Sequence, residues 1–324
     1  MDFVMSTNNL VVEEMMCCAA CGAAEADHIK LKKCNACYLV KYCSVKCQKE
    51  HRPKHKRECK KRAAELRDEL LFKQPESCHL GDCPICCLPL SVDESNSTMM
   101  SCCSKAICDG CDYADQMRET GGKRQSKCPF CRHPTPKSQE EAERIQKKRI
   151  EVNDPVAMRL MGFERQEKED YDGAFAYFTK ATALGDVGAH FHLSRMYHEG
   201  KGVEMNEKKV WHHLEEAAIK GHPKARHNLG CLEAGNGRAD RAVKHWIIAA
   251  KLGFDGSLEI LKDAFGKGLV SKEDFAAALR AHQAAVDATK SPQREAAELA
   301  REELEKIKRH REREVVAGNL SSLS

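Results

Sequence analysis

The distribution of cysteine is the feature that most constrains this chain. Of its 19 cysteines, 18 lie within the first 131 of 324 residues, mostly as C-x-x-C pairs interleaved with histidines. Two thiols at this spacing share one tight turn, with sulfurs about 3.7 Å apart, and a tetrahedral zinc ion binds four N or S donors. We therefore expect pairs of such turns to enclose zinc ions in the N-terminal third.

The composition and the segment lengths indicate where the protein is found and why its cysteine-rich segments need metal to fold. A hydrophobic fraction of 42% is compatible with globular folding and with about two domains. Segments of about 45 residues bury too little apolar surface to fold unaided, so bound metal must supply the missing free energy. Residues 1–16 lack the pattern of a signal peptide, and no apolar run has the length of a membrane span. We expect a cytoplasmic or nuclear protein, because thiols stay reduced there.

Positive charge is concentrated in one segment, although the formal net charge is only +4. Residues 41–62 hold ten Lys or Arg against Glu50 and Glu58. Such a run is either a phosphate-binding face or a solvated helix surface beside anionic thiolates. No aromatic ladder or RNA-binding motif accompanies it, so we expect a solvated surface, with neither nucleic acid nor membrane as a partner.

The first cluster contains four donor pairs of the types CxxC, CxxC, CxxxC and HxxxC, which suit two zinc ions. These donors are Cys18, Cys21, Cys34, Cys37, Cys43, Cys47, His55 and Cys59. Cys17 is an alternative to its neighbour Cys18, but the spacing to Cys21 favours Cys18. The order of the pairs, the Tyr-Cys-Ser step at 42–44 and the His-Lys-x-x-Cys ending resemble the MYND zinc finger.

The resemblance implies two interleaved metal sites, one built from Cys18, Cys21, Cys43 and Cys47, and the other from Cys34, Cys37, His55 and Cys59. HxxxC spacing spans one helical turn, so His55 and Cys59 can reach the same ion from one helix. Four protein donors on each ion leave no position for water or substrate, so we expect structural zinc. MYND fingers capture short proline-containing peptides, which is the partner that the resemblance implies.

The second cluster, residues 83–131, has the order CxxC, an adjacent pair of cysteines, CxxC and a final C-P-x-C followed by arginine. This order resembles a RING-type finger. Lys105 stands where that family has a ligating histidine, and an ammonium group has no lone pair for zinc. We expect one site from Cys83, Cys86, Cys108 and Cys111, and a second from Cys102, Cys103, Cys128 and Cys131. Cys87 and His133 are alternative donors. The expected total is four Zn²⁺ per chain, or three if this finger is degenerate.

The same resemblance raises an alternative function. RING-type ubiquitin ligases contact the conjugating enzyme and ubiquitin through an apolar residue, a proline and a cation, and Ile85, Pro129 and Arg132 occupy these positions. These residues can equally shape the metal-binding turns and face solvent without a partner.

Residues 154–270 repeat. Three segments align, their closing glycines Gly185, Gly221 and Gly253 lie 36 and then 32 residues apart, and alanines recur in step. Each unit predicts two helices around a turn, with the glycine as a left-handed cap. Such pairs bury their apolar face by stacking. The Tyr-x-x-Gly-x-Gly-Val and Ala-Ala-x-x-Gly elements resemble Sel1-like repeats, a tetratricopeptide-type subgroup.

The expected fold is therefore a pair of small zinc-stapled α+β modules followed by an all-α solenoid of helix-turn-helix repeats. A final charged helix starting at Ser291-Pro292 is expected to cover the last repeat. The predicted segments are a disordered 1–16, a MYND-like finger at 17–59, a helix and linker at 60–82, a RING-like finger at 83–132, a linker helix at 133–153, repeats at 154–270, capping helices at 271–314 and a disordered tail at 315–324.

The function expected from this organisation is recognition. The sequence contains no P-loop, G-x-S-x-G or H-E-x-x-H motif, so hydrolase or kinase chemistry has no support. We expect a zinc-binding adaptor or scaffold for proteins and peptides, with the finger capturing a peptide and the repeats holding a partner. The alternative is a ubiquitin ligase in which the MYND-like finger and the repeats select the substrate and a ubiquitin-conjugating enzyme is a further partner.

Overall fold

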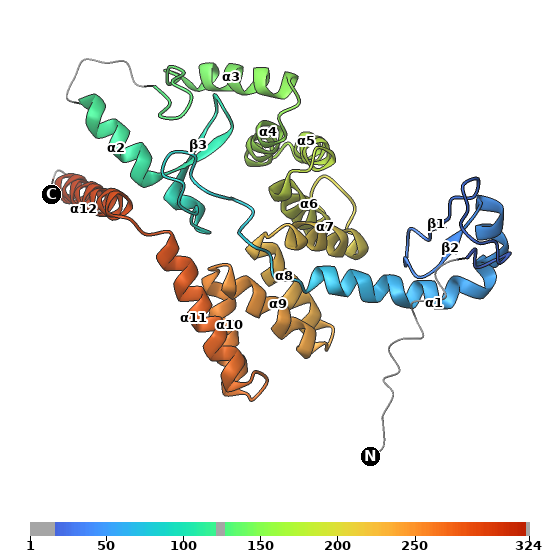
Figure 1. Cartoon of the computed structure of the whole chain (residues 1–324). Coiled ribbons are helices and arrows are strands. Elements are labelled where there is room, and N and C mark those ends of the chain that lie inside the picture. Colours follow the sequence, from blue (N-terminus) through green and yellow to red (C-terminus); the bar gives the residue numbers. More distant parts are fainter. Residues whose placement is uncertain (1–16, 121–126, 322–324) are drawn as a thin grey trace. The chain divides into compact units, whose positions relative to one another are not determined.

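A computed structural model describes residues 17–120 and 127–321 of the chain (Figure 1). The predicted disordered segment 1–16 lies outside the described residues. The chain separates into two compact units, Met1–Lys73 and Gln74–Ser324. Among the described residues, no helix has the length and apolar character needed to cross a membrane.

The first unit is a small zinc-finger module that continues into a long helix. Strands β1 (Lys32–Lys33) and β2 (Lys41–Tyr42) pair antiparallel, and helix α1 follows directly over Val45–Leu71. Ser44 caps the helix, because its hydroxyl accepts a hydrogen bond from the Cys47 amide at 3.2 Å. The helix predicted within segment 60–82 is thus the second half of α1, the helix that carries His55 and Cys59.

The second unit begins with another small module. A 3-10 turn η2 (Glu94–Asn96) leads into a hairpin of β3 (Ser97–Met100) and β4 (Lys105–Cys108), and helix α2 follows over Asp109–Thr120. The core of the module consists of cysteines together with Leu90 and the fully buried Ile107. So small an apolar core agrees with folding that depends on metal.

Helix α3 (Gln139–Glu151) connects this module to three helix pairs, each helix being 13 residues long. The pairs are α4 (Pro155–Glu167) with α5 (Tyr171–Ala183), α6 (Val187–Glu199) with α7 (Glu207–Ile219), and α8 (Pro223–Gly235) with α9 (Ala239–Lys251). Each pair packs on the next, which gives the predicted all-α solenoid. The closing glycines adopt positive φ of 83° to 90°, as the left-handed caps require.

Equivalent positions of the repeats share one packing pattern. The third residue of each first helix is an alanine with at most 1% exposure: Ala157, Ala189 and Ala225. The eighth residue is small, and in two repeats a large ring of the second helix fills the space beside it. A Cβ on Gly162 would lie 2.7 Å from the Phe178 ring, and a Cβ on Gly230 would lie 2.4 Å from Trp246. The small residues therefore set how closely the helices of a pair approach.

Three further helices complete the chain: α10 (Asp255–Gly266), α11 (Lys272–Ala288) and α12 (Pro292–Ser321). Helices α10 and α11 pack on α9 and so cover the last repeat. The prediction that the charged helix α12 also covers this repeat is wrong, because α12 packs on α2 of the second finger. Its backbone continues to Ser321, into the segment predicted as a disordered tail, and residues 322–324 lie outside the described residues. The other segment boundaries stay predictions.

Candidate metal centres

The structure gathers the sixteen predicted donors into four groups. Within each group, the four ligand atoms all lie within 4.8 Å of one another. The groups are Cys18, Cys21, Cys43 and Cys47; Cys34, Cys37, His55 and Cys59; Cys83, Cys86, Cys108 and Cys111; and Cys102, Cys103, Cys128 and Cys131. Each could hold one zinc ion, and we propose these side chains as its ligands.

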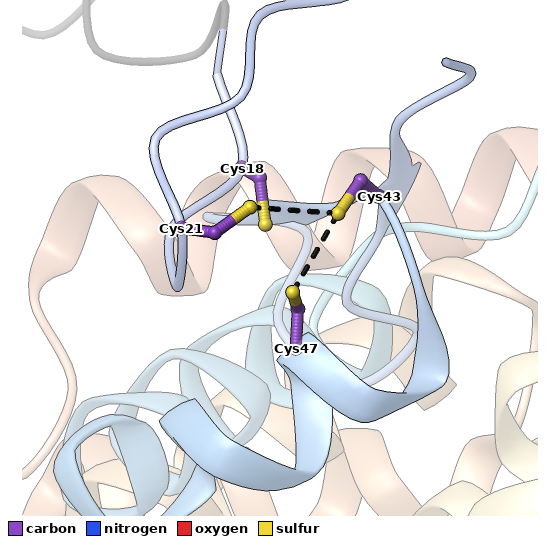
Figure 2. A group of neighbouring side chains, drawn as sticks. All are labelled: Cys18, Cys21, Cys43 and Cys47. Atoms are coloured by element: carbon purple, nitrogen blue, oxygen red, sulfur yellow. Dashed lines mark hydrogen bonds between the residues drawn. The ribbon is translucent and has the colours of Figure 1, made fainter. Parts of the chain in front are cut away.

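The first group joins three short segments (Figure 2). Cys18 and Cys21 come from the first CxxC turn, while Cys43 follows β2 and Cys47 lies in the first turn of α1. The Cys21 and Cys43 sulfurs are 3.6 Å apart, as are those of Cys43 and Cys47. A tetrahedral site with Zn–S bonds of 2.3 Å requires sulfurs about 3.7 Å apart, so this donor geometry fits zinc.

The second group draws two donors from α1. Cys34 and Cys59 have sulfurs 3.7 Å apart, and the Cys37 sulfur lies 3.2 Å from Nε2 of His55, which is buried. His51 stays outside the group: its Nδ1 shares a hydrogen bond with the Tyr42 hydroxyl at 3.1 Å. The alternative donor Cys17 is exposed and belongs to no group.

Four of the five CxxC pairs lie in turns with the same backbone geometry, while the fifth, Cys108 and Cys111, lies where β4 leads into α2. The amide of the residue after the second cysteine donates to the carbonyl of the first at 2.8 to 2.9 Å. That residue has a positive φ of 56° to 73° in every case: Gly22, Tyr38, Cys87 and Arg132. The left-handed residue closes the turn so that both thiols point to one side. The position favours glycine, but only the first turn has one.

Cys87 and Arg132 therefore have a local role that spacing alone did not indicate. Cys87 closes the turn of Cys83 and Cys86, is exposed, and is in none of the groups. The other alternative donor, His133, is also exposed, and its Nδ1 lies 2.9 Å from the Pro134 carbonyl oxygen. Among the described residues, neither alternative joins a donor group.

The fourth group contains the adjacent cysteines at the tip of the β3–β4 hairpin. The amides of Cys103 and Ser104 both donate to the Met100 carbonyl, and Ser104 takes a φ of 54°. This tight turn brings the Cys102 sulfur to 3.3 Å from that of Cys131, and the Cys103 sulfur to 3.9 Å from that of Cys128. In the third group, the Cys86 and Cys108 sulfurs are 3.7 Å apart. Lys105 is exposed in β4 and lies outside both groups.

Electrostatics also favour a cation in these groups. Burial and the neighbouring Cys34 thiol raise the pKa of Cys59 to about 12, and contact with the Cys47 and Cys21 thiols raises the pKa of Cys43 to about 12. Thiols packed this closely resist full deprotonation unless a cation offsets the negative charge. A zinc ion, when bound, supplies that charge and stabilises the four donors as ligands.

The three residues predicted to contact a conjugating enzyme do not belong to the metal groups. Ile85 is 41% exposed and Arg132 is also exposed, whereas Pro129 is partly buried in its turn. The Arg132 guanidinium lies 3.4 Å from the carboxylate of Asp115 on α2. Contact with a conjugating enzyme stays a prediction.

Sequence reasoning missed two arginines of α12 that contact the second finger. Arg294 donates to the carbonyl of Pro89 at 2.7 Å, and Arg301 pairs with Asp109 at 3.0 Å. No local pattern marks these residues, since their partners lie about 200 positions earlier in the chain.

Comparison with known proteins identifies the first finger. Residues 18–59 match the family model described as MYND finger. This segment is a MYND finger. It includes all eight donors of the first two groups, so the predicted resemblance is confirmed.

Other known proteins are similar to other stretches of the chain, or to part of the finger, at the following levels. A stretch of 31 residues is 61% identical to human histone-lysine N-methyltransferase SMYD3, covering 10% of this chain and only 7% of that protein. A solved Sel1 repeat protein from Oxalobacter formigenes is 22% identical, with a TM-score of 0.42 over 53% of this chain and 70% of that one. The antigen c5321 of uropathogenic Escherichia coli, displaying an SLR fold, is 21% identical, with a TM-score of 0.38 over 57% of this chain and 38% of that one.

Proposed function

We propose that this chain is a zinc-dependent adaptor, in which the MYND finger captures a short peptide and the helical repeats hold a protein partner. MYND fingers and helical repeats generally serve protein–protein interaction. The proposal depends most on one observation: the finger buries five of its eight metal donors but exposes large apolar side chains. Tyr38, Leu39 and Val45 are 55%, 44% and 66% exposed within this small module. Apolar side chains exposed on a small module are suited to recognition.

The donor sets support recognition over catalysis. Each group offers four protein donors to one ion, which leaves no coordination position for water or a substrate. Zinc bound there shapes the module and does not take part in a reaction. The peptide class expected from the MYND resemblance is proline-containing, because a preformed extended segment loses little entropy on docking.

An array of proline-containing peptides, probed with the full-length zinc-loaded chain, tests the proposal. Binders from the array are then measured by fluorescence anisotropy. We expect Leu39→Ser to weaken binding by about tenfold or more, since it removes one apolar contact. Lys32→Ser, a change at another exposed position of the finger, is the matched control and should leave affinity unchanged. Unchanged affinity in both variants would contradict peptide capture. An array without binders would contradict it as well.

Ubiquitin transfer by the second finger is the second candidate. The exposure of Ile85 and Arg132 supports it, because a conjugating enzyme must reach both side chains. Ubiquitin-chain formation by the zinc-loaded chain with a panel of conjugating enzymes is the test. Activity that disappears in Ile85→Ala would support this function, and wild-type protein as inactive as Ile85→Ala would refute it.

A further inference from the structure

The third donor group has a neighbour from the far end of the chain. Arg294, in the first turn of α12, directs its guanidinium into the loop that follows Cys86. It donates to the carbonyls of Pro89 at 2.7 Å and Leu88 at 3.2 Å, and a third N–H lies 3.5 Å from the Cys86 sulfur. This sulfur is one of the four donors of the group.

A second arginine of α12 contacts residues close to the same group. Arg301 donates to the Asn96 side chain at 2.9 Å and pairs with Asp109, the residue after the donor Cys108, at 3.0 Å. Residues seven apart lie on the same face of a helix, so one face of α12 contacts both chain segments that carry the donors. The approach is close: a Cβ on Gly110 would lie 2.7 Å from the Arg294 backbone nitrogen.

The charges of the metal site and of Arg294 favour this contact. Four thiolates around one Zn²⁺ leave the site with net negative charge, and a guanidinium is a permanent cation with several donors. An N–H group directed at a ligating sulfur orients that ligand and offsets part of its charge. Outer partners of this kind change metal affinity by about 10- to 100-fold when they are removed.

We propose that Arg294 is a positioning residue of the third metal centre, and that metal binding there and docking of α12 stabilise each other. Coupling of this kind is reciprocal: if the docked helix strengthens metal binding, bound metal strengthens helix docking by the same factor. The C-terminal helix is then held in place by zinc bound about 200 residues earlier in the sequence.

The rate of zinc release from the full-length, zinc-loaded chain tests whether Arg294 positions a ligand of the third metal centre. With excess chelator and a colorimetric indicator, Arg294→Gln should release one zinc ion per chain about 10- to 100-fold faster than wild type, with the other three unchanged. Arg309→Gln is the matched control, because Arg309 lies on the same helix and, among the described residues, donates only to the carbonyl of Glu305, one turn earlier. In the cobalt-loaded chain, the sulfur-to-metal charge-transfer absorption should shift in Arg294→Gln but not in Arg309→Gln.

Hydrogen exchange tests whether metal bound at the third group stabilises the docking of α12. Cys111→Ser disables the third group and should speed amide exchange over residues 292–301. Cys21→Ser disables the first group instead and should leave this exchange unchanged. Wild-type release kinetics in Arg294→Gln, equal acceleration of all the zinc ions, or unaltered protection of α12 in Cys111→Ser would each overturn the proposal.

Discussion

At the scale of single residues, neighbouring cysteines have different tasks. Cys86 and Cys87 are adjacent, but Cys86 points into the third donor group while Cys87 closes the turn with a φ of 56°. The same division holds for Cys18, a buried donor, and the exposed Cys17. Position on the turn, not the presence of a thiol, decides which cysteine can bind metal.

Substitutions at Cys86 and Cys87 should therefore differ in their effect on the zinc content. Cys86→Ser should lower the zinc content by one ion per chain, because a hydroxyl is a poor replacement for a thiolate. Cys87→Gly should keep the full zinc content and raise the free energy of unfolding by about 1 kcal/mol, because glycine adopts a positive φ without strain. Native mass spectrometry and chemical denaturation measure the two effects. Loss of a zinc ion in Cys87→Gly would refute the assignment.

The donors were predictable because a CxxC turn is a local structure whose spacing alone places two sulfurs together. The residue that closes the turn was not, since Tyr38, Cys87 and Arg132 are not residue types that favour a positive φ. For Cys87, proximity to other thiols gave a competing explanation in the sequence, that of an alternative donor.

At the scale of helices, small residues determine how closely the two helices of each repeat approach. Gly162 and Gly230 occupy the same position of two first helices, and each lies against a ring of the second helix. In the second repeat, this position is Ser194, which is buried, and Leu214 replaces the ring. The size of one residue is matched to that of its partner within each pair.

Gly162→Ala should lower the free energy of unfolding by about 1–3 kcal/mol, since the added methyl group would overlap the Phe178 ring, which is fully buried. Gly235 also lies in a first helix, but a Cβ added there would have no atom within 4 Å. Gly235→Ala should therefore raise the free energy of unfolding by up to about 1 kcal/mol. Thermal or denaturant unfolding separates the two variants. Equal stability of both would show that close helix approach does not depend on these glycines.

The helix pairs could be predicted because their period, closing glycines and alternating apolar residues are all local signals. The placement of α12 could not. Its apolar side chains Leu299 and Leu304 do not anchor it, because they are 67% and 52% exposed. The helix is held instead by arginines, whose partners are mainly backbone carbonyls that no sequence pattern marks.

At the scale of the whole molecule, the linker before the second finger is fixed to the repeats within the second unit. The His79 amide donates to the Gly221 carbonyl at 3.0 Å, and the His79 ring stacks on His222 with centroids 4.1 Å apart. His222 caps α8, its Nδ1 accepting from the Ala225 amide at 3.3 Å. The linker and the repeats therefore share a contact made by two histidines.

This linker contact should make stability depend on pH. Burial lowers the pKa of His79 to about 4 and holds that of His222 well below its ordinary value. The unfolded chain, with histidine pKa values near 6.5, therefore binds protons first as the pH falls. The stabilisation is complete above about pH 6.5 and is lost as the pH falls from there toward 4.

The variant His79→Gln/His222→Asn, which keeps a capping side chain at position 222, should show a flatter dependence of melting temperature on pH over this range. Zinc ligands are protonated alike in both proteins, so the difference from wild type isolates the two histidines. His198→Gln changes an exposed histidine of α6 and is the control. A profile identical to wild type in the double variant would contradict the contact.

Zinc stoichiometry tests the central claim most directly, because the account of both fingers assumes that the four donor groups each hold an ion. Native mass spectrometry of the full-length chain, purified under reducing conditions, gives the count without assumptions about activity. We expect the mass of the chain plus four zinc ions, all of them removed by chelation together with folded structure in the fingers. A chain that carries three or fewer ions, or whose cysteines are paired as disulfides, would contradict the account.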